Sequence, residues 1–364
     1  MKLTRLLSCL FLCIIGMSCI QDEAPNAEAD IVSCIVSSDI LKRDPIIQNA
    51  TVILMVKDSV DLTNLAPQFE LTPGATIEPV SGTVRDFTTP QSYVVTSEDK
   101  NWKKTYTVRC TTEGLTTKFD FEHSELEGNK YYVFYEILEG EEKQYMWASG
   151  NSGFAIVGGN KTADEYPTTP YDFGKNGKCL KLETRSTGDL GAMVNMRIAA
   201  GNLFIGEFYP LEAMANALKA THFGLPFSFV PVSLTGYYKY KRGEVFTEKD
   251  GSVNPDAKDN FDIYSILYET DDNVKYLDGT NFLTSPNLIA IARIGEDEKK
   301  ETDEWTYFNL PFVYQPGKTV DAEKLTAGKY NIAIVFSSSI EGDLFRGAVG
   351  SRLLIDEVEL VHNN

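Results

Sequence analysis

Apolar and polar residues alternate in short segments along most of the chain after residue 30. Side chains of a β-strand point alternately to its two faces, so this pattern predicts half-buried strands. The predicted strands are 31–36, 51–56, 118–122, 192–198, 226–230, 234–240, 262–268, 288–293, 305–310, 330–336 and 353–360. Helical spacing occurs around 210–220, where Ala and Leu follow Pro210. We therefore expect an all-β protein with one short helix.

Loops rich in Gly, Pro, Asn and Asp separate these segments and indicate two domains. Residues 30–112 contain short strands between turn signals, which predicts a small β-sandwich. Residues 115–364 contain about ten predicted strands and the single helix, which is typical of a larger β-sandwich of the jelly-roll type. Neither internal repeats nor low-complexity stretches interrupt the second domain.

The N-terminus has the pattern of an export signal. Lys2 and Arg5 precede an apolar run at 6–15, which is shorter than the ~20 residues of a membrane-spanning helix. Small residues then lead to Cys19, a pattern that resembles the lipobox of bacterial lipoproteins. The resemblance implies that residues 1–18 are a lipoprotein signal peptide and that Cys19 carries the lipid. An ordinary signal peptide or an uncleaved anchor is the alternative.

The composition narrows the class of partner. The chain is acidic, with a formal net charge of −18. We therefore exclude nucleic acid as a partner, because contacts to phosphate groups need Lys and Arg. Residues 19–29 are acidic and poor in apolar residues, which predicts a flexible tether. Asp22 and Glu23 behind the lipid site resemble the export signal of Bacteroidetes surface lipoproteins. They imply a lipid-anchored position on the outer membrane, with other envelope proteins as partners.

The first domain contains two cysteines that could form a disulfide. Cys34 and Cys110 lie in its first and last predicted strands. An oxidising compartment permits a disulfide between them, and two buried thiols are the alternative.

The first domain resembles a known spacer. Its pattern includes Leu65-Ala-Pro-Gln-Phe69, Pro73-Gly-Ala-Thr-Ile-Glu-Pro79 and a later Tyr93-Val-Val. This order resembles the immunoglobulin-like domain at the N-terminus of many Bacteroidetes surface lipoproteins. The resemblance implies an immunoglobulin-like β-sandwich that acts as a spacer without catalysis.

The second domain resembles a second family over nearly its whole length. The segments that carry the resemblance are Phe119-Asp-Phe-Glu122, Trp147-Ala-Ser-Gly-Asn-Ser-Gly-Phe154, Leu234-Thr-Gly-Tyr-Tyr-Lys-Tyr240 and the end at 347–360. They are similar to the carbohydrate-metabolism domain of Bacteroidetes lipoproteins. The resemblance implies a jelly roll like that of carbohydrate-binding modules, with an oligosaccharide or polysaccharide as partner.

A sugar binder needs aromatic faces for the C–H side of a ring and planar polar groups for the hydroxyls. Residues of these types gather at four places in the second domain. The predicted carbohydrate-binding residues are Trp147, Asn151, Tyr238, Tyr240, Asp262, Tyr264 and Trp305. Core packing is the alternative for each aromatic ring.

Metal binding and catalysis are weaker alternatives. Jelly-roll modules resemble one another in a structural Ca²⁺ site that joins the first and last strands, and Asp120, Glu122 and Asp356 occupy those ends. Such an ion would be structural, and no catalytic cofactor is expected. Glycoside hydrolysis needs two opposed carboxylates. The candidates beside apolar strands are Glu183, Glu207, Asp262 and Glu269.

These observations favour a surface-anchored lipoprotein that binds glycan through an aromatic face and is not an enzyme. The sequence contains no Gly-x-Ser-x-Gly, no Gly-rich phosphate loop and no His-Glu-x-x-His. A glycoside hydrolase or lyase acting on polysaccharide is the first alternative. An adhesin or structural surface subunit is the second.

Overall fold

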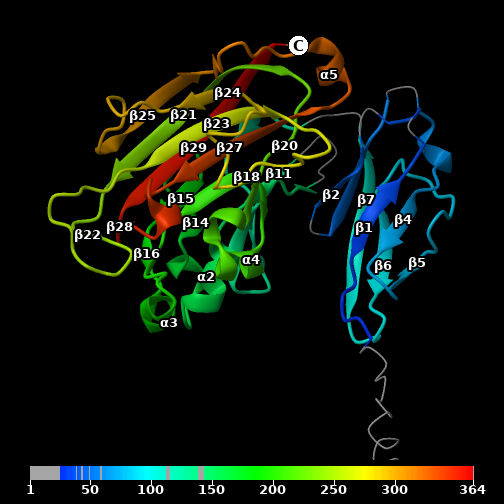
Figure 1. Cartoon of the computed structure of the whole chain (residues 1–364), viewed down its shortest axis with the longest axis horizontal. Coiled ribbons are helices and arrows are strands. Elements are labelled where there is room, and N and C mark those ends of the chain that lie inside the picture. The colour runs from blue at the N-terminus through cyan, green and yellow to red at the C-terminus, as the bar shows by residue number, and fades with distance from the viewer. Residues whose placement is uncertain are drawn as a thin grey trace, which may run out of the picture. The chain divides into compact units, whose positions relative to one another are not determined.

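The structure is a computed structural model that describes residues 25–363 except 38, 42–43, 49, 58–59, 112–114 and 138–142. The predicted signal peptide, Cys19 and the first part of the tether lie outside the described residues. The chain divides into two compact units, Met1–Thr111 and Thr112–Asn364 (Figure 1). No helix among the described residues is long and apolar enough to cross a membrane.

The N-terminal unit consists of two sheets around one core. Strands β1 (Ile31–Ile35) and β4 (Gln68–Leu71) form an antiparallel pair, and η1 (Leu62–Asn64) precedes β4. The second sheet has the order β2 (Ile46–Gln48), β3 (Thr51–Met55), β7 (Lys103–Thr111), β6 (Gln91–Thr96) and β5 (Thr76–Glu78). Strands β3 and β7 are parallel and the other pairs are antiparallel.

The end of the predicted tether is attached to this unit. The backbone N–H of Asn26 donates to Glu98 Oε2 at 2.8 Å, and Ala29 is buried in the core of the unit. The carboxylate of Asp30 accepts from the hydroxyl of Tyr106 at 2.8 Å and pairs with Lys104 at 2.6 Å. The prediction of a flexible segment that extends to residue 29 is therefore wrong at its C-terminal end, since backbone and side-chain contacts hold it.

Both cysteines of the N-terminal unit are free thiols. Cys34 is buried and Cys110 is half-buried, and both belong to the same core cluster. Burial raises the pKa of each thiol to about 12. The alternative of two buried thiols is the one that the structure contains.

The C-terminal unit is a sandwich of two antiparallel sheets. The first sheet has the order β13 (Trp147–Ala148), β18 (Asn202–Phe208), β27 (Tyr330–Ser337), β23 (Asp262–Glu269), β24 (Leu288–Arg293) and β26 (Val313–Tyr314), with β19 (Thr221–Phe223) beside β18 and β20 (Leu225–Pro226) beside β27. The second sheet has the order β14 (Thr168–Tyr171), β15 (Cys179–Glu183), β29 (Arg352–Asn363), β21 (Val230–Lys241) and β25 (Thr302–Pro311), with β8 (Lys118–Phe119) beside β29.

Four short antiparallel pairs complete the strands. They are β9 (Ser124–Glu127) with β10 (Tyr131–Phe134), β11 (Glu136–Ile137) with β12 (Lys143–Gln144), β16 (Arg185–Ser186) with β17 (Ile198–Ala199), and β22 (Phe246–Thr247) with β28 (Gly347–Ala348). The predicted fold class, an all-β protein built from sandwiches, is confirmed.

The main core lies between the two large sheets. Alternate residues of the first sheet, such as Ile263 and Phe336, meet alternate residues of the second, such as Leu234 and Ile355. All four side chains are fully buried. This burial follows the period-two pattern from which the strands were predicted.

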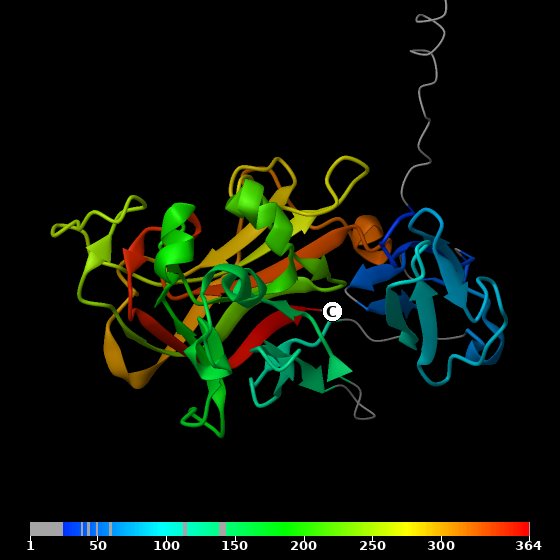
Figure 2. The same cartoon turned by 90° about the horizontal axis from the view of Figure 1, so that it is seen from below.

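Helices are short and more numerous than expected. The described helices are α2 (Asn151–Val157), α3 (Gly188–Met193), α4 (Pro210–Ala215) and α5 (Ala322–Thr326), with 3₁₀ turns η2 (Ala163–Glu165), η3 (Ala217–Lys219) and η4 (Gly342–Leu344). Figure 2 shows α2, α3 and α4, drawn in green, along one side of the C-terminal unit.

Three sequence predictions need correction in this unit. The predicted strand 192–198 is mostly the end of α3 and a turn, in which Met193 is 81% exposed, and of this segment Ile198 alone lies in a strand, β17. The predicted helix 210–220 is interrupted at Asn216, whose backbone is extended and whose side chain caps Leu218 N at 3.1 Å. The predicted strand 226–230 is divided between the end of β20 and the start of β21.

One buried carboxyl makes the stability of the C-terminal unit depend on pH. Glu136 is 6% exposed, and its Oε1 accepts a hydrogen bond of 2.9 Å from Trp147 Nε1. Burial raises the pKa of Glu136 to about 8. The folded state therefore retains a proton that the unfolded state, with a Glu pKa of about 4.3, has already released at neutral pH.

We predict that the stability of the C-terminal unit falls as the pH rises from about 4.5 to 8, because the folded state binds the extra proton over this range. Glu136→Gln keeps an acceptor for Trp147 and removes the titration. It should raise the free energy of unfolding at pH 8 by about 2 kcal/mol. Thermal melts at several pH values measure this, with Glu127→Gln in an exposed strand end as the control. A variant with the wild-type pH dependence would contradict the assignment.

Candidate functional site

The outward face of the first sheet carries a second, smaller apolar cluster. On β23, Ile263 points into the main core, while Tyr264 and Ile266 belong to the outward cluster with Phe204 and Val335. Helices α2 and α4, the turn η4 and the loop around Phe282 surround this face. The strand alternation thus places one set of side chains in the sandwich and the other set under the helices.

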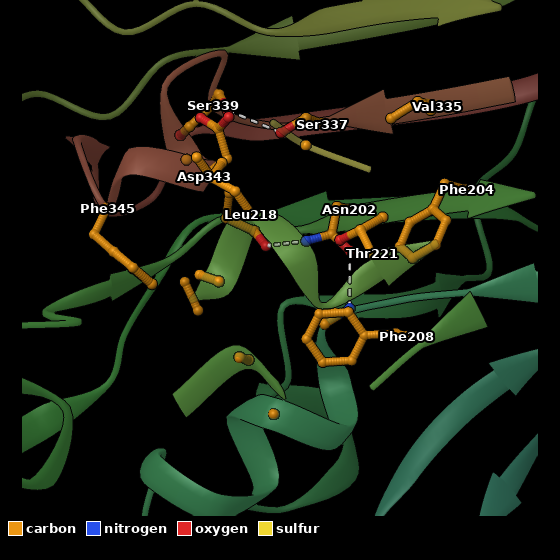
Figure 3. Close-up of a pocket in the computed structure, with 18 of the residues that line it drawn as sticks. Asn202, Phe204, Phe208, Leu218, Thr221, Val335, Ser337, Ser339, Asp343 and Phe345 are labelled. Atoms are coloured by element: carbon orange, nitrogen blue, oxygen red, sulfur yellow. Dashed lines mark hydrogen bonds between the residues drawn. The ribbon is translucent and has the colours of Figure 1, made fainter. Parts of the chain in front are cut away.

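A pocket of about 230 Å³ remains between this face and the segments that cover it. Its apolar walls include Phe204, Phe208, Leu218 and Phe282. Figure 3 shows Phe204 and Phe208 beside Asn202 on one side of the pocket, and Asp343 and Phe345 on the other. The ring of Phe282 stacks on that of Tyr264, with a centroid distance of 5.2 Å and an interplanar angle of 19°. Aromatic side chains therefore form much of the inner surface of the pocket.

An ion cluster contributes two residues, Asp262 and Arg293, to the pocket wall. Asp262 is 4% exposed and accepts from Arg293 Nε at 3.0 Å and from Arg293 Nη2 at 2.6 Å. Lys299, whose side chain is 1% exposed, places its ammonium 3.9 Å from Asp262. The Asp262 carboxylate binds Arg293 through both of its oxygens. Asp262 is therefore committed to holding Arg293 in position.

Arg293 is the part of this cluster that faces the pocket. Strand pairing places it opposite Tyr264, and its guanidinium carbon lies 5.6 Å from the centre of that ring. Its Nη1 makes no hydrogen bond to another described residue. This group is therefore a donor that a ligand can use.

A second carboxylate, Asp343, lines the pocket at its exposed rim on η4. Desolvation by the surrounding protein raises its pKa, and the nearby carboxylates of Glu341 and Asp262 act in the same direction. No cation pairs with Asp343 in the part of the chain that the structure describes. Asp343 is thus a polar group that remains available to a ligand.

The other polar side chains of the pocket are largely used by the fold. Asn202 Oδ1 accepts from Gly150 N at 2.8 Å, which fixes the start of α2. The Ser337 hydroxyl donates to Ser339 O at 2.8 Å, drawn as a dashed line in Figure 3. The Ser339 hydroxyl lies 2.6 Å from Asp259 Oδ2, below the pocket.

The predicted sugar-binding residues separate into three groups. Asp262 and Tyr264 line the pocket. Trp305 is half-buried on the outward face of the second sheet, away from the pocket. The remaining four are inside the fold, which excludes direct stacking or hydrogen bonding to a sugar.

Three of these buried residues are aromatic. Trp147, Tyr238 and Tyr240 are 6%, 1% and 2% exposed, and all three belong to the main core. Trp147 packs against Phe119 with a centroid distance of 5.0 Å. Tyr240 packs against Phe261 at 4.7 Å. The prediction of a stacking platform on these rings is wrong, because the core covers their faces.

Asn151 is also structural. Its side chain donates to Thr168 O at 2.7 Å and accepts from Thr168 N at 3.1 Å, so it acts as a backbone partner at the start of α2. Its buried amide has no group left for a ligand.

The predicted catalytic carboxylates do not converge. Glu183 pairs with Arg185 at 2.9 Å, and Glu269 pairs with Lys324 at 2.6 Å. Glu207 accepts from the Tyr209 hydroxyl at 2.5 Å. Of the four candidates, Asp262 alone lines the pocket.

Two of the three residues predicted to bind Ca²⁺, Asp356 and Glu122, hold a loop by its backbone. Asp356 is fully buried, and its Oδ2 accepts from Lys175 N at 2.6 Å and from Asn176 N at 3.2 Å. Glu122 Oε1 accepts from Lys178 N at 2.9 Å, and Asp120 accepts from Glu122 N at 3.1 Å. Among the described residues, no three His, Cys, Asp or Glu side chains lie close enough together to hold a metal ion.

Asp356 and Glu122 together form what we call the loop clasp, which holds the β14–β15 connection over the second sheet. Burial raises the pKa of Asp356 to about 6, and the backbone amides oppose this rise. The negative charge that a cation would neutralise is therefore stabilised by N–H groups of the loop.

We predict that Asp356→Ala releases this loop. Trypsin should then cleave after Lys175 and Lys178 several times faster than in the wild type, and the free energy of unfolding should fall by about 2 kcal/mol. Glu359→Ala on the same strand is the matched control and should retain the wild-type cleavage rate. Protection of the wild-type loop by added Ca²⁺ would contradict the clasp and favour a cation site.

Known proteins resemble both units of the chain. Residues 120–361 match the family described as "Putative carbohydrate metabolism domain", and residues 35–110 match the family described as "SGBP, N-terminal". No curated protein matches the chain.

Two solved structures from Bacteroides share the fold. One from Bacteroides thetaiotaomicron, named a putative glycoside hydrolase, is 56% identical, with a TM-score of 0.84, and covers 94% of this chain and 99% of its own. One from Bacteroides vulgatus with the same description is 47% identical, with a TM-score of 0.64, and covers 68% of this chain and 98% of its own. The chain belongs to the family of the Putative carbohydrate metabolism domain, preceded by a domain of the SGBP N-terminal family.

Proposed function

We propose that the chain is a surface glycan-binding protein whose C-terminal unit takes a short glycan segment into the pocket on the first sheet. The observation that carries the proposal is the combination of the Tyr264–Phe282 stack with two unsatisfied polar groups, Arg293 Nη1 and Asp343, in one cavity. Aromatic faces match the C–H side of a sugar ring, and these two groups bond hydroxyls. The relatives of this chain support a carbohydrate ligand.

The site favours binding over hydrolysis. A glycosidase needs an acid and a nucleophile or base on opposite sides of the scissile bond. Asp262 is held by Arg293 and Lys299 and is a weak nucleophile in that state. Asp343 is then the single carboxylate at the pocket without a cation.

Glycoside hydrolysis is the second candidate function. Two observations favour it: the raised pKa of Asp343, which suits a general acid, and the description of both Bacteroides relatives as putative glycoside hydrolases. A nucleophile would have to come from Asp262 after displacement of Arg293.

The position of the protein at the cell surface is part of the proposal. The SGBP N-terminal family and the lipobox-like sequence at Cys19 support a lipid anchor, with the N-terminal unit as a spacer. Several anchored copies would bind a long polysaccharide with avidity, and other envelope proteins are the expected neighbours.

We predict that the soluble chain from residue 20 binds at least one oligosaccharide on an array of plant, host and microbial glycans. Phe282→Ala and Asp343→Asn should each weaken that binding about tenfold in calorimetry, because they remove the stacking face and a hydroxyl partner. Trp102→Ala, which removes an exposed ring of the N-terminal unit, is the control and should bind like the wild type.

The same samples separate binding from hydrolysis. Chromatography of the bound oligosaccharide after long incubation should show it intact. Release of shorter products that Asp343→Asn abolishes would support the hydrolase instead. Full affinity in both pocket variants would show that the pocket is not the binding site.

A further inference from the structure

The outward face of the second sheet exposes a row of aromatic rings that no helix covers. Tyr237 on β21 lies directly opposite Tyr307 on β25, with ring centroids 5.3 Å apart. Tyr307 is 55% exposed, and Trp305 lies two residues along the same strand and is half-buried. Side chains two apart on a strand share a face, so the three rings lie on one surface.

Two lysines cover these rings. Lys175 Nζ lies 4.2 Å from the centre of the Tyr237 ring, and Lys239 Nζ lies 5.1 Å from that of Trp305. Neither ammonium forms an ion pair with any described residue. We call Tyr237, Trp305, Tyr307 and the two lysines the aromatic strip.

The loop clasp explains why Lys175 is part of the strip. Asp356, which lies beside Tyr237 in the strand register, binds the backbone N–H of Lys175. The fold thus uses a buried carboxylate to bring a charged loop residue over an aromatic ring, where it interacts with the ring face.

The acidic side chains of β15 and β29 already have polar partners. Asp356 and Glu357 accept hydrogen bonds from Lys175 N and Asn176 Nδ2. Glu183 on β15 pairs with Arg185, and Glu359 on β29 lies 3.6 Å from Lys118. In a chain with a net charge of −18, two lysines without a carboxylate partner on one aromatic surface form a local positive region. Such a surface complements an anion.

We propose that the aromatic strip is a second glycan site, separate from the pocket, which binds an acidic polysaccharide through its sugar rings and its carboxylate or sulfate groups. The rings contact the C–H faces of successive residues, and Lys175 and Lys239 pair with the anionic substituents. An open strip across two strands has no end wall, so it accepts the middle of a chain as well as its end.

The test compares ligands that differ in charge alone. Affinity electrophoresis of the soluble chain from residue 20 through gels with polygalacturonate should show retardation, and fully methyl-esterified polygalacturonate should retard it at least tenfold less. Alginate, hyaluronate and chondroitin sulfate form the remaining acidic arms, which separate carboxylate from sulfate recognition. Higher salt should weaken the retention.

Variants then place the binding on the strip. Lys175→Gln/Lys239→Gln should lower the affinity for the acidic polymer that binds best about tenfold. Trp305→Ala should lower that affinity by a similar factor and leave the salt dependence of binding unchanged. Lys130→Gln/Lys249→Gln removes the same charge from exposed positions elsewhere and should have no such effect. Melting curves confirm that each variant is folded.

The pocket variant Phe282→Ala distinguishes binding at the aromatic strip from binding in the pocket. It should leave retention by the acidic polymer unchanged, whereas Tyr307→Ala should reduce it. Absence of retention by all four acidic polymers would overturn the strip as an acidic-glycan site. Retention that survives Lys175→Gln/Lys239→Gln would overturn it as well, and neither result would bear on the pocket.

Discussion

The organisation of the C-terminal unit depends on the alternation of side chains in β23 and its neighbours, because both faces of this sheet are buried. Ile263 and Phe336 contribute to the core between the sheets, whereas Tyr264 and Val335 contribute to the outward cluster. Short helices cover that cluster, and the space that they leave is the pocket. The same strands therefore stabilise the sandwich and build the floor of the site.

The outward faces of the two sheets differ in how far they are covered by other segments. Helices cover the outward apolar face of the first sheet and leave one cavity there. The aromatic rings on the outward face of the second sheet lie beside lysines and are not covered by helices. Tyr237 and Tyr307 form a cross-strand pair, which stabilises the sheet, yet the Tyr307 ring remains 55% exposed and available to a ligand. The clasp at Asp356 adds to that argument, since it fixes a loop whose lysine contacts one of the rings.

The sequence predicted the fold class because strand periodicity is a local property. The same alternation places Tyr238 and Tyr240 on one face of their strand and Tyr237 and Lys239 on the other. Which of these faces enters the core depends on the partner sheet, and no local pattern contains that information. Tyr238 and Tyr240, which were predicted to bind, therefore lie in the core, whereas Trp305 lies on the outward face.

Long-range contacts account for most of the site that the sequence did not reveal. Arg293 lies 31 residues after Asp262, and strand pairing alone brings them together. Asp343 comes from a short turn that has no distinctive pattern. Asp120, Glu122 and Asp356 were found as acids at the ends of the domain, but the backbone of the 172–178 loop, which satisfies two of them, has no signature in the side-chain sequence.

The placement of the two proposed sites has a consequence for the ligand. The pocket and the aromatic strip lie on the outward faces of opposite sheets, and packed sheets are separated by about 10 Å before their outward side chains are added. A single sugar ring therefore cannot contact both sites. Simultaneous occupation needs a long chain that passes around the edge of the sandwich, or two chains. Either arrangement would let one copy of the protein hold a polysaccharide at two points, and the second contact would then form at a high effective concentration. Under the proposed function, weak binding at each site is sufficient, because the two contacts together hold the polymer.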